Sequence, residues 1–225
     1  MPAGAVLVHG LWHGAWVWEP VQQRLTDAGI ASIAVELPLN SLVADEAVAR
    51  EALRELDRPA VLVGHSYGGA VITGAGSSPS TIHLVYLAAF QLDEGESVSR
   101  TLPHLDVPST RLSEALRFDD DLVHLDPQLA AELMYNGVPE QVTAEALARL
   151  RPVHSSVFSG TPGMVTWRTV ESTYVVCTDD LTVHPDLQRA MANRATRRID
   201  WDCGHSPAAA RPDAVADLII ALARQ

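Results

Sequence analysis

The chain has 225 residues, of which 47% are hydrophobic and 20% are charged. This length suits one domain with an insertion, and the composition excludes collagen, coiled coils and low-complexity disorder. The formal net charge of -12 repels phosphate backbones and argues against a nucleic-acid partner. All 16 basic residues are arginine, which excludes a lysine Schiff base and a P-loop lysine.

The cysteines and the hydropathy pattern predict a soluble protein. Cys177 and Cys203 are too few for a disulfide framework or a cysteine-based zinc site, and we interpret both as small buried hydrophobic residues. No apolar stretch reaches the ~18 residues of a membrane span, and the first residues lack the basic start of a signal peptide. We expect a cytoplasmic monomer or homodimer with no membrane partner.

Short apolar runs alternate with helical patterns along most of the chain. The predicted strands are continuously apolar and do not alternate between apolar and polar residues. Strands of this kind are typical of a parallel sheet that helices cover on both faces. The sequence therefore predicts an α/β fold with about six strands. Strands are expected at 5–8, 30–35, 60–63, 83–90, 173–177 and 199–201, and helices at 18–28, 44–56, 70–75, 185–193 and 212–224.

Residues 91–164 form an interval too long for a simple crossover between parallel strands. Helical patterns occur at 127–134 and 139–150. We interpret the interval as a helical cap inserted over the sheet, within a single domain that comprises residues 1–225. The acidic run 119–121 is interpreted as a solvated surface rather than a metal site.

The sharpest motif is Gly64-His65-Ser66-Tyr67-Gly68, which lies between an apolar run and a helical pattern. A G-x-S-x-G turn between a strand and a helix raises a serine above the sheet, where its hydroxyl can act as a nucleophile. Such a turn predicts Ser66 as the nucleophile. The alternative is an ordinary tight turn.

A second loop supports this interpretation. His9-Gly10-Leu11 follows the first predicted strand, where this architecture supplies half of an oxyanion hole. The backbone N–H groups of Leu11 and Tyr67 are expected to converge on a developing oxyanion, and each such donor contributes about 3–4 kcal/mol to catalysis. The alternative is that His9 and Gly10 simply end the strand.

A serine nucleophile needs a base and an acid that orients the base. His205 follows the last predicted strand, and Asp179 and Asp180 follow the preceding one, which gives the chain order Ser, Asp, His. Either aspartate could be the acid, and Asp93 at the end of an earlier strand is a third candidate. The other histidines are not in a strand-to-helix loop downstream of the acid: His9, His13, His65, His83, His104, His124, His154 and His184.

These residues resemble the α/β-hydrolase superfamily. The stretches HGLWHGAWVWEP, VLVGHSYGGAVI, VYLAAF, STYVVCTDDLTVHPDLQRAMA and CGHSP are similar to the branch of plant methylesterases, hydroxynitrile lyases and bacterial, pyrethroid-hydrolase-like esterases. The resemblance implies Ser66 as nucleophile, Asp180 as acid, His205 as base, and the Leu11 and Tyr67 amides as the oxyanion hole.

The chain departs from the lyases at two positions. Gly10 stands where they have threonine, and Ser206 stands where they have a lysine that stabilises departing cyanide. The leading hypothesis is therefore a serine hydrolase acting on a small carboxylic ester, with no metal or organic cofactor. Trp12, Phe90 and Trp167 are expected near strand ends, as an apolar pocket or as core packing. The alternatives are C–C or thioester cleavage, lyase or cyclase chemistry, or ligand binding with little turnover.

Overall fold

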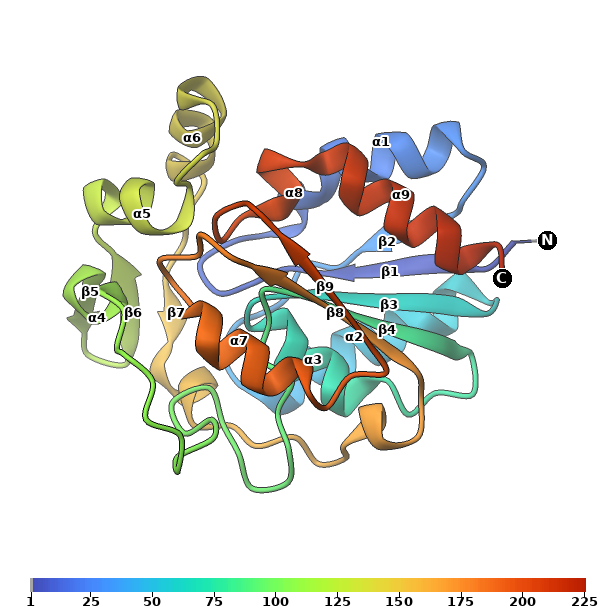
Figure 1. Ribbon diagram of the computed structural model, residues 1–225, viewed down its shortest axis with the longest axis horizontal. Helices are drawn as coiled ribbons and strands as arrows, with labels where there is room; N and C mark the ends of the chain where they lie inside the picture. The colour runs from blue at the N-terminus through green and yellow to red at the C-terminus, as the bar shows by residue number, and fades with distance from the viewer. Residues whose placement is uncertain (1) are drawn as a thin grey trace.

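Six parallel strands form the central sheet of the computed structural model, which describes residues 2–225 (Figure 1). Their order is β2-β1-β3-β4-β8-β9. This arrangement confirms the predicted α/β fold and its number of strands. The strands are β1 (Gly4–Val8), β2 (Ser32–Ala34), β3 (Ala60–His65), β4 (Thr81–Leu87), β8 (Ser172–Cys177) and β9 (Arg197–Trp201).

The central strands are buried on both faces. Every residue of β1, β3 and β8 is buried, which is why these segments read as continuous apolar runs and not as alternating patterns. The pairing between β1 and β3 joins Val6 to Leu62 and Val8 to Gly64. Because all pairs are parallel, the carboxyl ends of β1, β3, β8 and β9 lie at one edge of the sheet.

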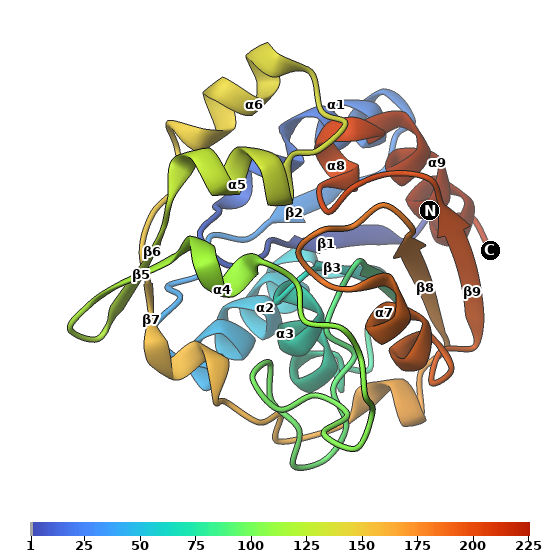
Figure 2. The same ribbon diagram turned by 60° about the vertical axis from the view of Figure 1, so that its left-hand side comes forward.

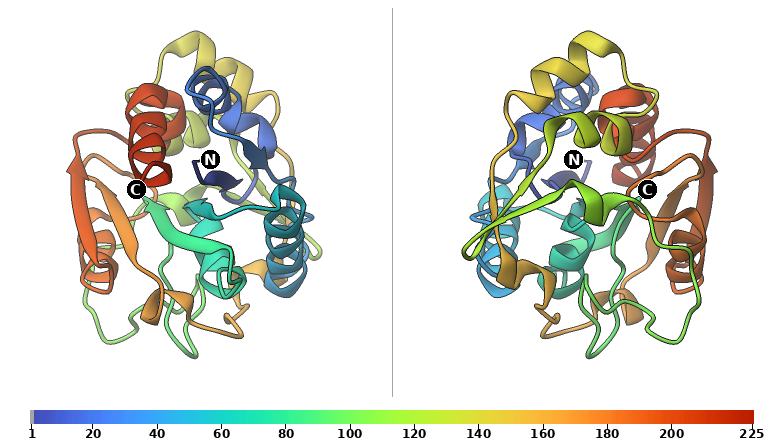
Figure 3. Two further views of the ribbon diagram at one scale, coloured as in Figure 1. Left: turned by 90° about the vertical axis from the view of Figure 1, so that its right-hand side faces the viewer. Right: turned by 90° about the vertical axis from the view of Figure 1, so that its left-hand side faces the viewer.

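Helices cover both faces of the sheet (Figure 3). On one face α1 (Glu19–Asp27) packs against α9 (Pro212–Ala223), with η1 (Ala15–Trp18) and α8 (Pro207–Ala210) beside them. On the other face lie α2 (Leu42–Leu56), α3 (Gly68–Ala75) and α7 (Pro185–Ala192). The five helices predicted outside the cap are all present. Within residues 2–225, no helix combines the length and hydropathy needed to cross a membrane.

The segment predicted as a helical cap contains strands as well as helices (Figure 2). The expected helices are α5 (Pro127–Met134) and α6 (Glu140–Leu147), preceded by α4 (Leu112–Ala115). A three-stranded sheet, which we did not predict, combines β5 (Leu116–Asp119), β6 (Leu122–Leu125) and β7 (Val153–His154). Two short 3₁₀ helices follow, η2 (Ser155–Phe158) and η3 (Thr166–Arg168).

The cap thus contains the expected helices and, in addition, a hairpin. Asp119 pairs with Leu122 across a two-residue loop, and Asp120 has a left-handed φ of 50° that suits such turns. The acidic run 119–121 is exposed, as the solvated interpretation requires. The sequence of β5 does not predict a strand, because its residues after Leu116 are all exposed and show no buried face. Even Phe118 is 69% exposed.

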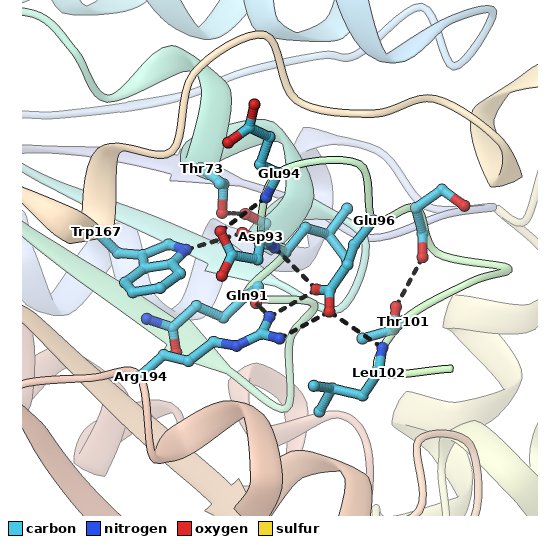
Figure 4. A network of polar contacts seen from close by, with 12 residues as sticks. Thr73, Gln91, Asp93, Glu94, Glu96, Thr101, Leu102, Trp167 and Arg194 are labelled. Atoms are coloured by element: carbon cyan, nitrogen blue, oxygen red, sulfur yellow. Dashed lines mark hydrogen bonds and ion pairs between the residues drawn. The ribbon is translucent and has the colours of Figure 1, made fainter. Parts of the chain in front are cut away.

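A polar network holds the start of the cap segment to the sheet domain (Figure 4). Arg194, just after α7, donates two hydrogen bonds to the Glu96 carboxylate at 2.6 and 2.7 Å, and a third to the Gln91 carbonyl at 2.7 Å. Trp167 Nε1 donates to the Leu92 carbonyl at 2.8 Å. The charged hydrogen bonds hold the pKa of Glu96 below its usual range, although burial of the carboxyl opposes this effect. The chain that leaves β4 is thus fixed at several points.

Candidate functional site

Ser66 occupies a strained turn at the carboxyl end of β3. Its φ is 53°, in the left-handed region that residues with a side chain seldom adopt. The turn is tight: a Cβ on Gly64 would lie 2.5 Å from the carbonyl oxygen of Gly68, and one on Gly68 would overlap the β1 backbone. The glycines of the motif therefore allow the close packing of strand, turn and helix that the sequence predicted.

His205 and Asp180 meet at the same edge of the sheet. His205 Nδ1 and Asp180 Oδ2 lie 2.7 Å apart, and both side chains are completely buried. Because a carboxylate oxygen only accepts, the Nδ1–H of His205 is the donor. The Nε2 atom of His205 is also buried and has no hydrogen-bond partner within residues 2–225.

Both oxygens of the Asp180 carboxylate accept hydrogen bonds from protein groups. Its Oδ1 accepts from the backbone N–H groups of Thr182 and Val183 at 2.7 and 2.9 Å, and its Oδ2 also accepts from Gln188 Nε2 at 2.7 Å. Asp179 contributes only backbone contacts, including N–H donation to the Cys203 carbonyl at 3.1 Å. The geometry thus pairs Asp180, and not Asp179, with His205. Asp93 instead pairs with Arg168.

His65 connects the serine turn to His205. Its Nε2–H donates to the His205 carbonyl at 2.7 Å, and the two rings lie 4.8 Å apart. Ser66 follows His65 directly and is 8% exposed. Burial, followed by the nearby His205, lowers the pKa of His65 well below its usual value, so His65 remains a neutral donor.

Leu11 and Tyr67, the predicted oxyanion donors, follow β1 and Ser66. Across residues 2–225, neither backbone N–H donates to another protein group, so both are available to a ligand. The Tyr67 side chain turns into the core, where its hydroxyl donates to Asp45 Oδ2 at 2.6 Å. Trp12, next to Leu11, has a φ of 63°, which bends this loop in a way that the sequence did not reveal.

The His9 side chain stabilises the loop after β1 through two hydrogen bonds to the backbone. Its Nδ1–H donates to the Gly10 carbonyl at 2.8 Å, and its Nε2 accepts from the Leu37 N–H at 3.1 Å. Burial lowers the pKa of His9 to about 4. A neutral imidazole with this tautomer satisfies both backbone groups at once, so His9 is a structural residue.

A cavity of about 300 Å³ lies beside the histidines. His13, His65 and Tyr135 contribute polar groups to it. His13 donates from Nδ1 to the Leu11 carbonyl at 2.6 Å and accepts at Nε2 from the Tyr135 hydroxyl, also at 2.6 Å. Burial lowers the pKa of His13 to about 3. The remaining wall is formed by Trp16, Val17, Glu19, Pro20, Val142, Glu145, Ala146, Arg149, Ser206, Ala208, Ala209 and Pro212.

The three aromatic residues expected in the pocket do not line this cavity. Trp12 is 3% exposed and donates from Nε1 to the Val123 carbonyl at 2.9 Å, which joins the loop after β1 to the cap. Trp167 belongs to the network around Arg194, and the backbone N–H of Phe90 donates to the Ser66 carbonyl at 3.0 Å. Their place in a substrate pocket stays a prediction.

Sequence reasoning missed His13 and Tyr135 as parts of the cavity wall. The repeated His-Gly in HGLWHG was a usable signal for His13, because a second histidine four residues after the first lies on the same loop. Tyr135 follows α5 in the cap, and no local pattern marks it. Within residues 2–225, no group of three or more His, Cys, Asp or Glu side chains is placed to hold a metal ion.

Comparison with known proteins identifies the family of this chain. Residues 5–218 match the sequence profile described as "Alpha/beta hydrolase family". Alpha/beta hydrolase nvfD of Aspergillus novofumigatus is 26% identical over 95% of this chain and 94% of its own, and Methylesterase 7 of Arabidopsis thaliana is 27% identical over 97% and 95%. The crystal structure of a pyrethroid hydrolase from Sphingobium faniae JZ-2 superimposes with a TM-score of 0.84 and 19% identity, over 98% of this chain and 97% of that chain. The resemblance stated from the sequence is thereby confirmed, and the chain belongs to the alpha/beta hydrolase family.

Proposed function

We propose that this protein is a carboxylic ester hydrolase that acts through an acyl-enzyme on Ser66. The observation that carries the proposal is the completely buried Asp180–His205 hydrogen bond, which leaves the free His205 Nε2 at the edge of the sheet where Ser66 turns out of β3. Similarity to a plant methylesterase over 97% of the chain supports ester hydrolysis as the reaction.

The first half of the reaction forms the acyl-enzyme. His205 Nε2 removes the Ser66 proton while Oγ attacks the ester carbonyl. The N–H groups of Leu11 and Tyr67, which no protein acceptor occupies, donate to the oxyanion of the tetrahedral intermediate. The imidazolium then gives its proton to the leaving alkoxide, and an alcohol departs.

The second half releases the acid. His205 Nε2 removes a proton from water, the hydroxide attacks the acyl carbonyl, and Ser66 recovers its proton as the carboxylic acid leaves. Asp180 stabilises the imidazolium and fixes the tautomer throughout. Because its carboxylate already accepts from Thr182, Val183 and Gln188, these hydrogen bonds fix its orientation toward His205.

The cavity that His65, the neighbour of Ser66, helps to line supports a proposal for the size and character of the substrate. A volume of about 300 Å³ lies at the lower end of the range for small-molecule sites, and most of its wall is apolar. The neutral His13–Tyr135 pair adds no formal charge at its polar end. We propose a small, uncharged ester as the substrate, and a monomer as sufficient for the reaction since every proposed catalytic group comes from one chain.

Hydrolysis of p-nitrophenyl esters from acetate to octanoate tests the proposal. Wild-type protein is expected to turn over the shorter esters, and Ser66→Ala to reduce kcat by about 10⁴-fold or more, because the nucleophile is lost. Ser77→Ala, a change at an exposed serine outside the site, is the matched control and should leave kcat unchanged.

A second pair of variants identifies the acid. Asp180→Asn should lower kcat by about 10⁴-fold, because it favours the wrong tautomer of His205. Asp179→Asn keeps its backbone contacts and should stay near wild type. If folded wild-type protein labels once at Ser66 and never turns over, the hydrolase proposal is wrong and a ligand-binding role takes its place.

A further inference from the structure

The chain has two cysteines, and the fold places them side by side. Cys177 is the last residue of β8, and Cys203 follows the end of β9. Their Sγ atoms lie 3.5 Å apart, although 25 residues separate them in the sequence. No disulfide joins them in this structure. The proposed reaction uses neither thiol, so the pair calls for a separate explanation.

The two thiols differ in their access to solvent. Cys177 is completely buried, whereas Cys203 is 8% exposed and lines a second cavity of about 360 Å³. Polar residues surround Cys203 there, including Asn136, Asp179, Asp202 and Arg211. None of the residues lining this cavity lines the cavity beside His13. A small polar reagent can therefore reach Cys203 by a route that does not cross the proposed substrate site.

The surroundings also make Cys203 the more acidic thiol. The hydrogen-bond contact between the two thiols lowers the pKa of Cys203, the positive charge of Arg211 lowers it further, and burial opposes both. The same contact with Cys203 and the burial of Cys177 raise the pKa of Cys177. Because the thiolate is the nucleophile in thiol chemistry, Cys203 reacts first and Cys177 remains as its partner.

Each cysteine connects to the Asp180–His205 pair through one intervening residue. The backbone N–H of Cys177 donates to Gln188 Oε1 at 2.9 Å, and Gln188 Nε2 donates to Asp180 Oδ2 at 2.7 Å. Cys203 stands two residues before His205, and its carbonyl accepts from the Asp179 N–H at 3.1 Å. A shift in either cysteine is thus transmitted to the carboxylate or the imidazole within one or two contacts.

We propose that Cys177 and Cys203 are a redox-active thiol pair that a hydroperoxide converts to a disulfide, and that this disulfide displaces Asp180 and His205. The first part stands on the geometry of the thiols, and the second rests on the proposed function. Bond formation brings the sulfur atoms from 3.5 Å to about 2.05 Å, and the two side chains together with the ends of β8 and β9 take up this change of about 1.5 Å.

The hydroperoxide is the oxidant that converts the two thiols to a disulfide. The Cys203 thiolate attacks the terminal peroxide oxygen, the O–O bond breaks, and the departing alkoxide takes up the thiol proton to give an alcohol and Cys203 sulfenic acid. Cys177 sulfur then attacks the sulfenic sulfur, the S–O bond breaks, and water leaves with the Cys177 proton. The two thiols lose two electrons, which reduce the hydroperoxide to an alcohol and water.

Treatment of the native protein with hydrogen peroxide tests both parts. Thiol titration after denaturation should fall from two thiols to none, and peptide mass spectrometry should find one intramolecular link, which can join only Cys177 and Cys203. Labelling of Ser66 by a fluorophosphonate and hydrolysis of p-nitrophenyl acetate should both slow by about 100-fold, as expected for a displacement of about 1 Å in a catalytic group. Dithiothreitol should restore both rates.

Single-cysteine variants provide the controls. Cys203→Ala should keep its full rate under the same peroxide treatment, which separates thiol oxidation from damage at the four methionines. In Cys177→Ala the oxidation should stop at the sulfenic acid of Cys203, which dimedone traps. Cys203→Ser replaces Cys203→Ala if Cys203→Ala does not fold. Two titratable thiols after treatment, or a disulfide with unchanged Ser66 labelling, would overturn the proposal. Absence of ester turnover with normal disulfide formation and slowed labelling would instead reject only the proposed function.

Discussion

Buried histidines form the polar frame of the site, and burial keeps them neutral. Burial lowers the pKa of His9 to about 4 and that of His13 to about 3. Each ring donates from Nδ1 to one backbone carbonyl and uses Nε2 as an acceptor, a pattern that only the neutral imidazole can provide. Protonation would turn Nε2 of either ring from an acceptor into a second donor. In His9 this donor would face the Leu37 N–H, and in both histidines the positive charge would be buried.

These shifts predict that the protein loses stability as the pH falls below neutrality. The unfolded chain takes up protons on His9 and His13 near pH 6.5, and the folded chain does so only near pH 4 and pH 3. Unfolded protein therefore binds more protons in this window, and the free energy of unfolding decreases as the pH decreases. From pH 7 to pH 5 each histidine should cost about 2 kcal/mol.

Urea denaturation between pH 4 and pH 7.5 measures this loss. His9→Gln removes one titrating group and should reduce the slope of unfolding free energy against pH by about one proton, even if it lowers stability at every pH. His104→Gln, on an exposed segment of the cap, is the matched control and should leave the slope unchanged. Equal slopes for wild type and His9→Gln would mean that His9 takes up its proton at the same pH in the folded and the unfolded protein.

At the scale of elements, the β3–α3 turn depends on glycines that leave no room for a side chain. A Cβ at Gly64 would meet the Gly68 carbonyl oxygen at 2.5 Å, and backbone atoms cannot move aside as a flexible side chain can. Gly64→Ala should lower the free energy of unfolding by about 2–3 kcal/mol and reduce kcat, because Ser66 moves with the turn.

Gly163→Ala is the control for this prediction. No atom lies within 4 Å of a Cβ at Gly163, and its φ is not in the left-handed region. Its effect on stability should therefore stay within about 0.5 kcal/mol. Denaturant unfolding and ester hydrolysis of the two variants check the comparison. Wild-type stability and rate in Gly64→Ala would show that the turn tolerates a wider geometry than this structure has.

The sheet domain and its polar residues could be predicted from the sequence because their signals are local. Continuous apolar runs identify buried parallel strands, and the carboxyl ends of those strands share one edge, which brings together the segments that bear Ser66, Asp180 and His205. The residues alone left both Asp179 and Asp180 open, and the family resemblance implied Asp180. The structure shows that Asp180 is the carboxylate that faces His205. The two main helices of the cap could be predicted, but its small sheet and its contacts with the sheet domain could not, because they join distant residues: Trp12 Nε1 bonds to the carbonyl of Val123, 111 residues away.

At the scale of the whole molecule, Arg151, just before β7 in the cap segment, binds the cap to the loop after β1. Its Nε donates to the His13 carbonyl at 2.8 Å, and its Nη2 donates to the Leu37 carbonyl at 2.6 Å and pairs with Glu36 at 2.7 Å. Its backbone N–H also donates to the Trp12 carbonyl at 3.0 Å. This loop carries Leu11, so the same arginine holds both the cap and a proposed oxyanion donor in place.

Arg151→Lys should weaken both functions, although the charge is kept. A guanidinium reaches three acceptors in fixed directions, whereas a single ammonium at the end of a flexible stem cannot replace all of them. We expect the free energy of unfolding to fall by about 1–2 kcal/mol through the lost hydrogen bonds, and kcat to fall about tenfold with little change in KM, since an oxyanion donor acts mainly in the transition state. Arg117→Lys is the matched control and should leave kcat unchanged, because within residues 2–225 the side-chain hydrogen bonds of Arg117 go to Glu114, Leu116 and Asp126, all in the cap. Steady-state kinetics well below the unfolding midpoint measures the effect, and an unchanged kcat in Arg151→Lys would mean that the loop after β1 keeps its shape without the guanidinium.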